Sequence, residues 1–113
     1  MAVLRIVPNL PARDPAALSA WYSRVLGLKP VMDLGFIITL TGTGKQDPQL
    51  SLASEGGART DLPAVSIEVD DLDPVIMQAG EAVVYGPAIE DWGVRRIYLR
   101  DPEGNLVNVL QHI

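Results

Sequence analysis

The residue types that carry out most protein chemistry are scarce in this sequence. Its 113 residues include no cysteine and one histidine, His112. Thiolate zinc sites, iron–sulfur clusters and cysteine nucleophiles are therefore excluded, and there is too little histidine for a pair of imidazole ligands. The acidic group Glu68, Asp70, Asp71 and Asp73 lacks the spacing of an EF-hand and coincides with an expected helix start. Because carboxylates are favoured at that end of a helix, we interpret this group as helix capping.

The remaining candidates for chemistry are polar and aromatic residues in the last quarter of the chain. Arg96 and Tyr98 alternate with Ile97 and Leu99, which predicts a strand with the arginine and the tyrosine on one face. A guanidinium there can pair with a ligand carboxylate, stack over an aromatic plane, or balance neighbouring acids. Trp92 lies in a charged loop that contains glycine. We interpret it either as a stacking wall for a flat ligand or as a contact in a dimer interface.

Charge and hydropathy exclude two classes of partner. Nine Lys and Arg residues against fourteen Asp and Glu residues give a formal charge of −5, which disfavours nucleic acid. No apolar stretch approaches the roughly 20 residues that a membrane span needs. We therefore expect a cytoplasmic protein without nucleic-acid or membrane partners, and its 113 residues fit a single domain.

Short elements must position the candidate residues, and their order repeats. The first half predicts one helix from Asp14-Pro15 to Gly27, with Trp21 and Tyr22 on its packing side, and strands over 4–10, 31–34, 36–41 and 49–53. The second half predicts a short helix that starts near Asp73 and ends at Gly80, and strands over 65–69, 81–85, 94–100 and 105–111. A polar, glycine-rich segment at about 55–62 is interpreted as a linker. The chain is thus expected to be one domain, 1–113, of two modules at about 1–54 and 63–113.

The first half contains IVPNLPARDPAALSAWYSRVLGL, and the second contains DWGVRRIYLRDPEGNLVNVL. These segments resemble the vicinal oxygen chelate superfamily, which includes glyoxalase I, extradiol dioxygenases and the bleomycin-resistance proteins, and they look closest to the bleomycin-resistance branch. The resemblance covers essentially the whole chain. It implies an α+β fold of two βαβββ modules, whose curved, half-barrel mixed sheets enclose a ligand cavity that a second subunit usually completes.

Metal-dependent members of this superfamily hold a divalent ion with one residue, typically His or Glu, from each of four cavity strands. The resemblance places these positions at Val7, Ser51, Ala64 and Asn108. Valine and alanine cannot coordinate a metal, and the neutral oxygens of serine and asparagine are weak ligands for a transition metal. We therefore expect the fold to be kept without a metal ion or any other cofactor.

Strand alternation around Asn108 predicts the lining of the cavity. A period of two places Leu106 and Leu110 beside Asn108 and turns the valines between them toward the helices. An apolar wall with a few polar tips suits a small organic ligand. No catalytic and no metal-binding residue is predicted, and the predicted ligand-binding residues are Val7, Asn9, Ser51, Trp92, Arg96, Tyr98, Leu106, Asn108 and Leu110.

Three functional hypotheses follow. The leading one is metal-independent binding of a small organic, flat or partly aromatic molecule, as in antibiotic resistance by drug sequestration. The alternative is a metal-independent lyase or isomerase, in which Tyr98 or Arg96 polarises a carbonyl and an acid such as Glu68 assists. A metal-dependent glyoxalase or dioxygenase activity needs ligands that the four positions lack. Because modules of about 55 residues have small cores, we also expect a homodimer, with or without exchange of modules between chains.

Overall fold

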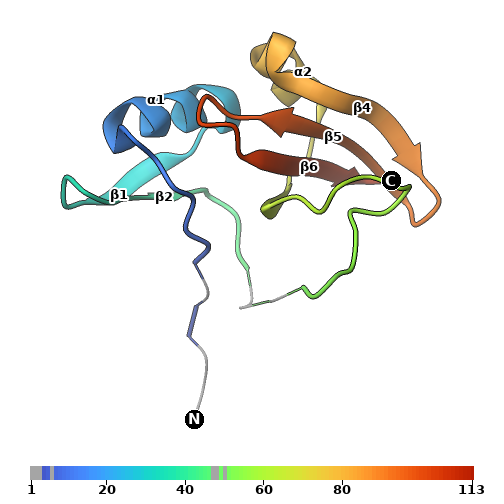
Figure 1. Ribbon diagram of the computed structural model, residues 1–113, viewed down its shortest axis with the longest axis horizontal. Helices are drawn as coiled ribbons and strands as arrows, with labels where there is room; N and C mark the ends of the chain where they lie inside the picture. Colours follow the sequence, from blue (N-terminus) through green and yellow to red (C-terminus); the bar gives the residue numbers. More distant parts are fainter. Residues whose placement is uncertain (1–3, 6, 47–48, 50) are drawn as a thin grey trace.

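The fold combines two α-helices with two sheets, as Figure 1 shows. The computed structural model describes residues 4–5, 7–46, 49 and 51–113. The elements in these residues are α1 (Pro15–Leu26), β1 (Lys29–Asp33), β2 (Ile38–Thr41), β3 (Val65–Glu68), α2 (Asp73–Ala79), the 3-10 turn η1 (Gly80–Ala82), β4 (Val83–Glu90), β5 (Val94–Arg100) and β6 (Leu106–His112). Within the described ranges no helix is long and apolar enough to cross a membrane. The predicted α+β class is confirmed.

Helix α1 begins and ends where the sequence predicts. The Asp14 carboxylate accepts a hydrogen bond from the Ala17 N–H at 3.2 Å, and Pro15 occupies the first helical position. Gly27 ends the helix with φ of 69°, a left-handed conformation that favours glycine, and its N–H donates to the Ser23 carbonyl. The buried side of the helix carries Leu18, Tyr22 and Val25, as the helical spacing requires.

The four-stranded sheet, in the order β3-β6-β5-β4, supplies most of the core. β3 pairs with β6 in parallel, and β5 is antiparallel to both of its neighbours. One face of this sheet packs against both helices through four side chains that have no exposed surface: Ile97, Leu99, Val107 and Val109. Because successive side chains of a strand point to opposite faces, Arg96, Tyr98 and Asn108 lie on the other side.

The second half of the chain follows the predicted order with two shifted boundaries. β4 spans Val83–Glu90 instead of 81–85, because Gly80–Ala82 continues helix α2 as a 3-10 turn. Pro87 lies inside β4, and this is tolerated because β4 is an edge strand. Of the acidic group that we interpreted as capping, Asp71 accepts a hydrogen bond from the Asp73 N–H at 3.1 Å. Glu68 instead contacts His112, with 3.0 Å between Oε2 and Nδ1.

The first half departs further from the prediction. β1 and β2 pair as an antiparallel hairpin beside α1, but the described residues of the segments 4–10 and 49–53 form no strand. A strand is stable only when a neighbour pairs with its backbone. Both segments extend away from the four-stranded sheet (Figure 1), and within the described chain neither has a strand to pair with. The hairpin also leaves apolar side chains exposed: Val31, Met32, Leu34 and Phe36.

Candidate functional site

The candidate site lies on the side of the four-stranded sheet that faces away from the helices, which we call the open face. Cross-strand pairing aligns Ser66 of β3 with Asn108 of β6, Asn108 with Tyr98 of β5, and Tyr98 with Tyr85 of β4. The polar side chains of these four residues, one from each strand, therefore form one row across the sheet. Such pairs are close enough to interact directly. The open face consists of Ser66, Tyr85, Arg96, Tyr98, Leu106, Asn108 and Leu110.

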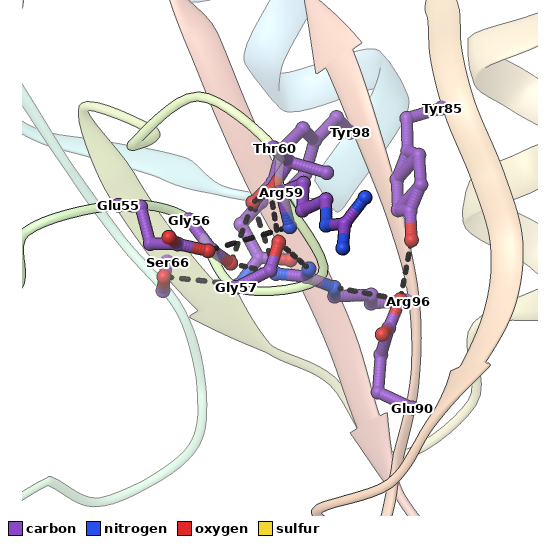
Figure 2. A network of polar contacts seen from close by, with 11 residues as sticks. Glu55, Gly56, Gly57, Arg59, Thr60, Ser66, Tyr85, Glu90, Arg96 and Tyr98 are labelled. Carbon is purple, nitrogen blue, oxygen red and sulfur yellow. Dashed lines mark hydrogen bonds and ion pairs between the residues drawn. The ribbon is translucent and has the colours of Figure 1, made fainter.

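Arg96 is the centre of a buried network on this face, shown in Figure 2. Its side chain is only 4% exposed, and its Nε lies 3.4 Å from the Glu90 carboxylate, which is 7% exposed. The guanidinium also lies over three aromatic rings, at 5.5 Å from Tyr85, 5.0 Å from Trp92 and 4.8 Å from Tyr98. A buried charge must be paired and hydrogen-bonded, and this arrangement meets both conditions.

Glu90 ties Tyr85 into the same network. The Tyr85 hydroxyl donates a hydrogen bond to the Glu90 carboxylate, with 2.5 Å between the oxygens. That hydrogen bond raises the pKa of the Tyr85 phenol above its usual value, because it favours the protonated form beside a negative charge. The Arg96 charge acts against this effect. Glu90 thus accepts a hydrogen bond from Tyr85 and lies against the guanidinium of Arg96.

A loop of residues 55–60, which we call the covering loop, lies on this network (Figure 2). The Gly56 carbonyl accepts hydrogen bonds from Arg96 Nη1 at 2.9 Å and from the Tyr98 hydroxyl at 3.0 Å. The Gly57 carbonyl accepts from Arg96 Nη2 at 3.4 Å, and Thr60 Oγ1 lies 2.7 Å from the Tyr98 hydroxyl. The loop therefore covers the part of the open face that the sequence predicted to meet a ligand.

Asn108 is the least satisfied polar group of the open face. Its side-chain amide donates to Ser66 Oγ at 3.0 Å. The other end of the carboxamide, Oδ1, is buried and has no hydrogen-bond partner in the described structure. Most buried polar side-chain atoms in proteins have a partner, so this exception requires an explanation. The apolar residues Leu106, which is buried, and Leu110, which is half-buried, flank Asn108 on the same face.

The structure gathers six of the nine predicted ligand-binding residues and separates the other three. Trp92, Arg96, Tyr98, Leu106, Asn108 and Leu110 belong to the open face or its border. Val7, Asn9 and Ser51 are exposed on segments that extend away from the sheet. Glu90 and two backbone carbonyls already accept hydrogen bonds from the Arg96 guanidinium. A ligand carboxylate would have to compete with them for the pairing that the sequence predicted.

A groove of about 470 Å³ lies elsewhere, between α1 and the turn after β5. None of the nine predicted residues borders it, and its lining consists of Asp14, Ala17, Leu18, Ala20, Trp21, Arg24, Pro102 and Glu103. At the place on the sheet where the sequence predicted a cavity, the covering loop lies on Arg96 and Tyr98.

The residues at the four positions of the superfamily's metal site do not fit a metal ion. Val7 and Ala64 have no donor atom, Ser51 is exposed, and Asn108 directs its amide N–H to Ser66. Among the residues that the structure describes, no three His, Cys, Asp or Glu side chains gather. Uncharged oxygens without an imidazole or a carboxylate are weak ligands for a transition metal.

Sequence reasoning did not find the acidic and loop partners of the site. Glu90 comes after the predicted strand 81–85, and only the longer β4 brings it beside Arg96. Gly56 and Thr60 lie in the segment that we interpreted as a linker. The pair of adjacent glycines is the one signal in that segment, since a chain that approaches another backbone closely needs residues without a side chain.

Comparisons with known proteins return likenesses in fold. The crystal structure of TioX from Micromonospora sp. ML1 is 24% identical, covers 96% of each chain and has a TM-score of 0.63. A lactoylglutathione lyase from Agrobacterium tumefaciens is 27% identical over 90% of this chain and 88% of that one, also with a TM-score of 0.63. No protein family profile matches the chain.

One curated protein is also similar in sequence. Virulence protein STM3117 of Salmonella typhimurium is 36% identical over 72 residues, or 59% of this chain, and the match spans only about half of that protein, 48%. These likenesses agree with the helices and the mixed sheet described above. The chain therefore has the glyoxalase-like fold, and the match to a lactoylglutathione lyase supports a place in the vicinal oxygen chelate superfamily.

Proposed function

We propose that this chain binds a small organic molecule on the open face and needs no metal ion to do so. The observation that carries the proposal is the unpartnered carboxamide oxygen of Asn108. A buried acceptor without a partner costs about 1–3 kcal/mol. A purely structural position in this sheet would be better filled by an apolar residue, as Val107 and Val109 fill the other face. A ligand with an N–H or O–H group would satisfy the oxygen.

The surroundings of Asn108 favour an uncharged and flat ligand. Leu106, Leu110 and the ring of Tyr98 offer apolar surface next to the carboxamide. Glu90 already balances the charge of Arg96 at 3.4 Å, so an anion would enter the site without a free cation to pair with. Apolar walls with a few oriented polar groups are the usual composition of a small-molecule site.

The proposed role is sequestration in the cytoplasm, of the kind that bleomycin-resistance proteins perform. We include a homodimer in this proposal. The exposed apolar side chains of the β1-β2 hairpin, with Phe36 at 81% exposure, form a surface that a second copy can cover. Light scattering should give the mass of two chains, and Phe36→Asp should shift it toward one. A monomer at all concentrations would contradict this part.

Trp92 provides a direct test of binding. The chain contains two tryptophans, so Trp21→Phe leaves Trp92 as the single reporter beside Arg96. We expect planar neutral compounds, starting with naphthalene-2-carboxamide, to change its emission in a saturable way. Asn108→Leu should weaken binding about tenfold, the equivalent of one hydrogen bond of roughly 1.4 kcal/mol.

The matched control is Gln78→Ala on the exposed side of α2, which should bind like the parent. The proposal fails if no compound in a panel of neutral aromatic amides and phenols changes Trp92 emission. If Asn108→Leu binds as tightly as the parent, Asn108 is not the group that holds the ligand.

The second candidate function is a metal-independent lyase or isomerase. Two donors, Arg96 Nη1 and the Tyr98 hydroxyl, converge on one carbonyl oxygen, that of Gly56. Two donors aimed at one oxygen are also how enzymes stabilise an enolate or another oxyanion. Mass spectrometry of the bound compound distinguishes the two functions, because a binding protein returns it unchanged and an enzyme returns a product.

A further inference from the structure

The covering loop occupies hydrogen-bond donors that a ligand would otherwise use. Two donors of the open face, Arg96 Nη1 and the Tyr98 hydroxyl, both point at the Gly56 carbonyl. A third contact joins Arg96 Nη2 to the Gly57 carbonyl at 3.4 Å. The open face thus binds a peptide group of its own chain, and this group shows what chemistry the surface recognises.

The fit of the loop depends on its two glycines. A Cβ on Gly56 would overlap with the Asp61 carbonyl oxygen and the Tyr98 hydroxyl. A Cβ on Gly57 would lie 2.8 Å from the Trp92 ring, closer than real Cβ contacts. Trp92 therefore packs against the loop as well as over Arg96. We therefore expect any side chain at Gly56 to exclude the loop from this position.

The docked loop carries backbone strain. After Gly57, at φ of 81°, both Ala58 and Arg59 have positive φ, at 49° and 62°. The left-handed region costs a residue with a Cβ about 1 kcal/mol or more. Because Ala58 and Arg59 are exposed, burial of their side chains does not offset this cost. The turn is closed by the loop's own hydrogen bond from the Thr60 N–H to the Gly57 carbonyl at 2.9 Å, and its contacts with Arg96 and Tyr98 hold it on the sheet.

The loop also leaves the open face incompletely satisfied. It supplies carbonyl acceptors to Arg96 and Tyr98 but no donor to Asn108, whose Oδ1 remains without a partner next to Tyr98 in the row. A compound that offers both an acceptor and a donor would pair all three groups. An amide is neutral and has both, with its acceptor oxygen and its N–H donor on different atoms, so that each can meet a different group of the sheet.

We infer that the covering loop is a displaceable lid and that the ligand it admits carries an amide, whose oxygen replaces the Gly56 carbonyl and whose N–H pairs with Asn108. This inference rests on the proposed binding function. The ligand is neutral, because the Glu90–Arg96 pair leaves no spare charge. Binding then replaces the Gly56 carbonyl by a ligand oxygen and also gives the unpaired Asn108 oxygen a donor.

The test compares naphthalene-2-carboxamide with naphthalene in chains that carry Trp21→Phe, with Trp92 emission as the readout. Gly56→Ala excludes the loop, and Thr60→Ala weakens its contact with Tyr98. We expect Gly56→Ala to bind the carboxamide at least tenfold more tightly than the parent, and Thr60→Ala to shift affinity in the same direction by a smaller factor. Ser54→Ala, an exposed change just before the loop, is the control and should bind like the parent.

Each remaining outcome has a defined meaning. Adding Tyr98→Phe to Gly56→Ala should reduce the preference for the carboxamide over naphthalene about tenfold, the equivalent of one hydrogen bond. Equal affinities in the parent, Gly56→Ala and Thr60→Ala would overturn the lid while leaving the proposed function intact. If Gly56→Ala binds the carboxamide and naphthalene equally well, the inference that the ligand carries an amide is wrong. If Gly56→Ala does not fold, as judged by circular dichroism, Thr60→Ala alone decides. Failure of the whole aromatic panel would instead remove the proposed function itself.

Discussion

The two faces of the four-stranded sheet both contain buried residues but differ in how burial is achieved. Toward the helices, Ile97 and Val109 have no exposed surface and belong to the hydrophobic core. On the open face, Arg96 and Tyr98 are each 3% exposed, yet a strained loop covers them and hydrogen bonds hold it. Burial on the apolar face needs no directional partners, whereas burial of polar groups on the open face depends on hydrogen bonds. The same strands thus carry stability on one face and recognition on the other.

The largest effect should follow a change on the apolar face. Leu99→Ala removes a fully buried side chain from the centre of the core. Such substitutions cost about 2–5 kcal/mol, because the transfer energy is lost and a cavity remains. Urea denaturation should show a loss of about 3 kcal/mol in the free energy of unfolding. Leu110→Ala, half-buried on the open face, is the matched control and should cost well under half as much. Equal losses would contradict the comparison of the faces.

The next largest effect should follow a change to the buried ion pair of the open face. Glu90→Gln keeps the shape of the side chain but leaves the Arg96 charge without its carboxylate. Removing one partner of a buried pair costs several kcal/mol, and the ring and carbonyl contacts of Arg96 reduce the expected loss to about 2 kcal/mol. A double-mutant cycle with Arg96→Met in urea should show coupling between the two residues. Additive losses would mean that Glu90 and Arg96 do not act as a pair.

Sequence patterns predicted the parts of the fold that local chemistry determines. Asp14-Pro15 and Gly27 fixed both ends of α1, because a cap and a left-handed residue are local requirements. Alternation in 94–100 and 105–111 correctly separated Ile97 and Val109 from Arg96. In both cases the residues within a few positions along the chain contain all the information needed.

The rest depends on pairing partners far away in the sequence. The segments 4–10 and 49–53 have strand-like composition, yet their described residues find no neighbouring strand, so Val7, Asn9 and Ser51 do not join the site. Gly56 and Arg96 meet across 40 positions, and no local pattern signals that contact. Contacts between residues so far apart in the sequence follow from the topology of the fold rather than from the secondary-structure propensity of local segments.

A third prediction concerns the hydrogen bond that connects helix α1, in the first half of the chain, to the turn between β5 and β6 in the second half. The Tyr22 hydroxyl of α1 donates to the Asp101 carboxylate at 2.8 Å, and Asp101 also organises the turn between β5 and β6 through Asn105. Tyr22→Phe should lower the free energy of unfolding by about 1.5 kcal/mol, the usual contribution of a hydrogen bond to a charged group. Urea denaturation at pH 7 measures it, with Tyr85→Phe on the open face for comparison.

Tyr22 also predicts how stability changes in alkali. Burial, followed by the hydrogen bond to Asp101 and its charge, raises the pKa of Tyr22 well above its ordinary value of 10. Above pH 10 the unfolded chain loses this proton while the folded chain keeps it, so the unfolded state binds fewer protons and stability falls as pH rises. The contribution is complete below pH 10. Tyr22→Phe should flatten the decline above pH 10, and an unchanged slope would contradict this assignment.

The smallest effect should come from Glu68, a second carboxylate on the same side of the sheet as Glu90. The two contacts of these carboxylates differ mainly in how far they are buried. Glu68 Oε2 lies 3.0 Å from His112 Nδ1, a shorter contact than the 3.4 Å between Glu90 and Arg96, but both side chains are 62% exposed. Exposed pairs contribute about 0.2–1 kcal/mol and are screened by salt. Glu68→Gln should therefore cost about 0.5 kcal/mol or less in urea denaturation. Glu90→Gln should cost several times more and change little with salt, because water and ions do not reach it. If the two substitutions cost the same, burial does not determine the strength of these two contacts, and the comparison between them fails.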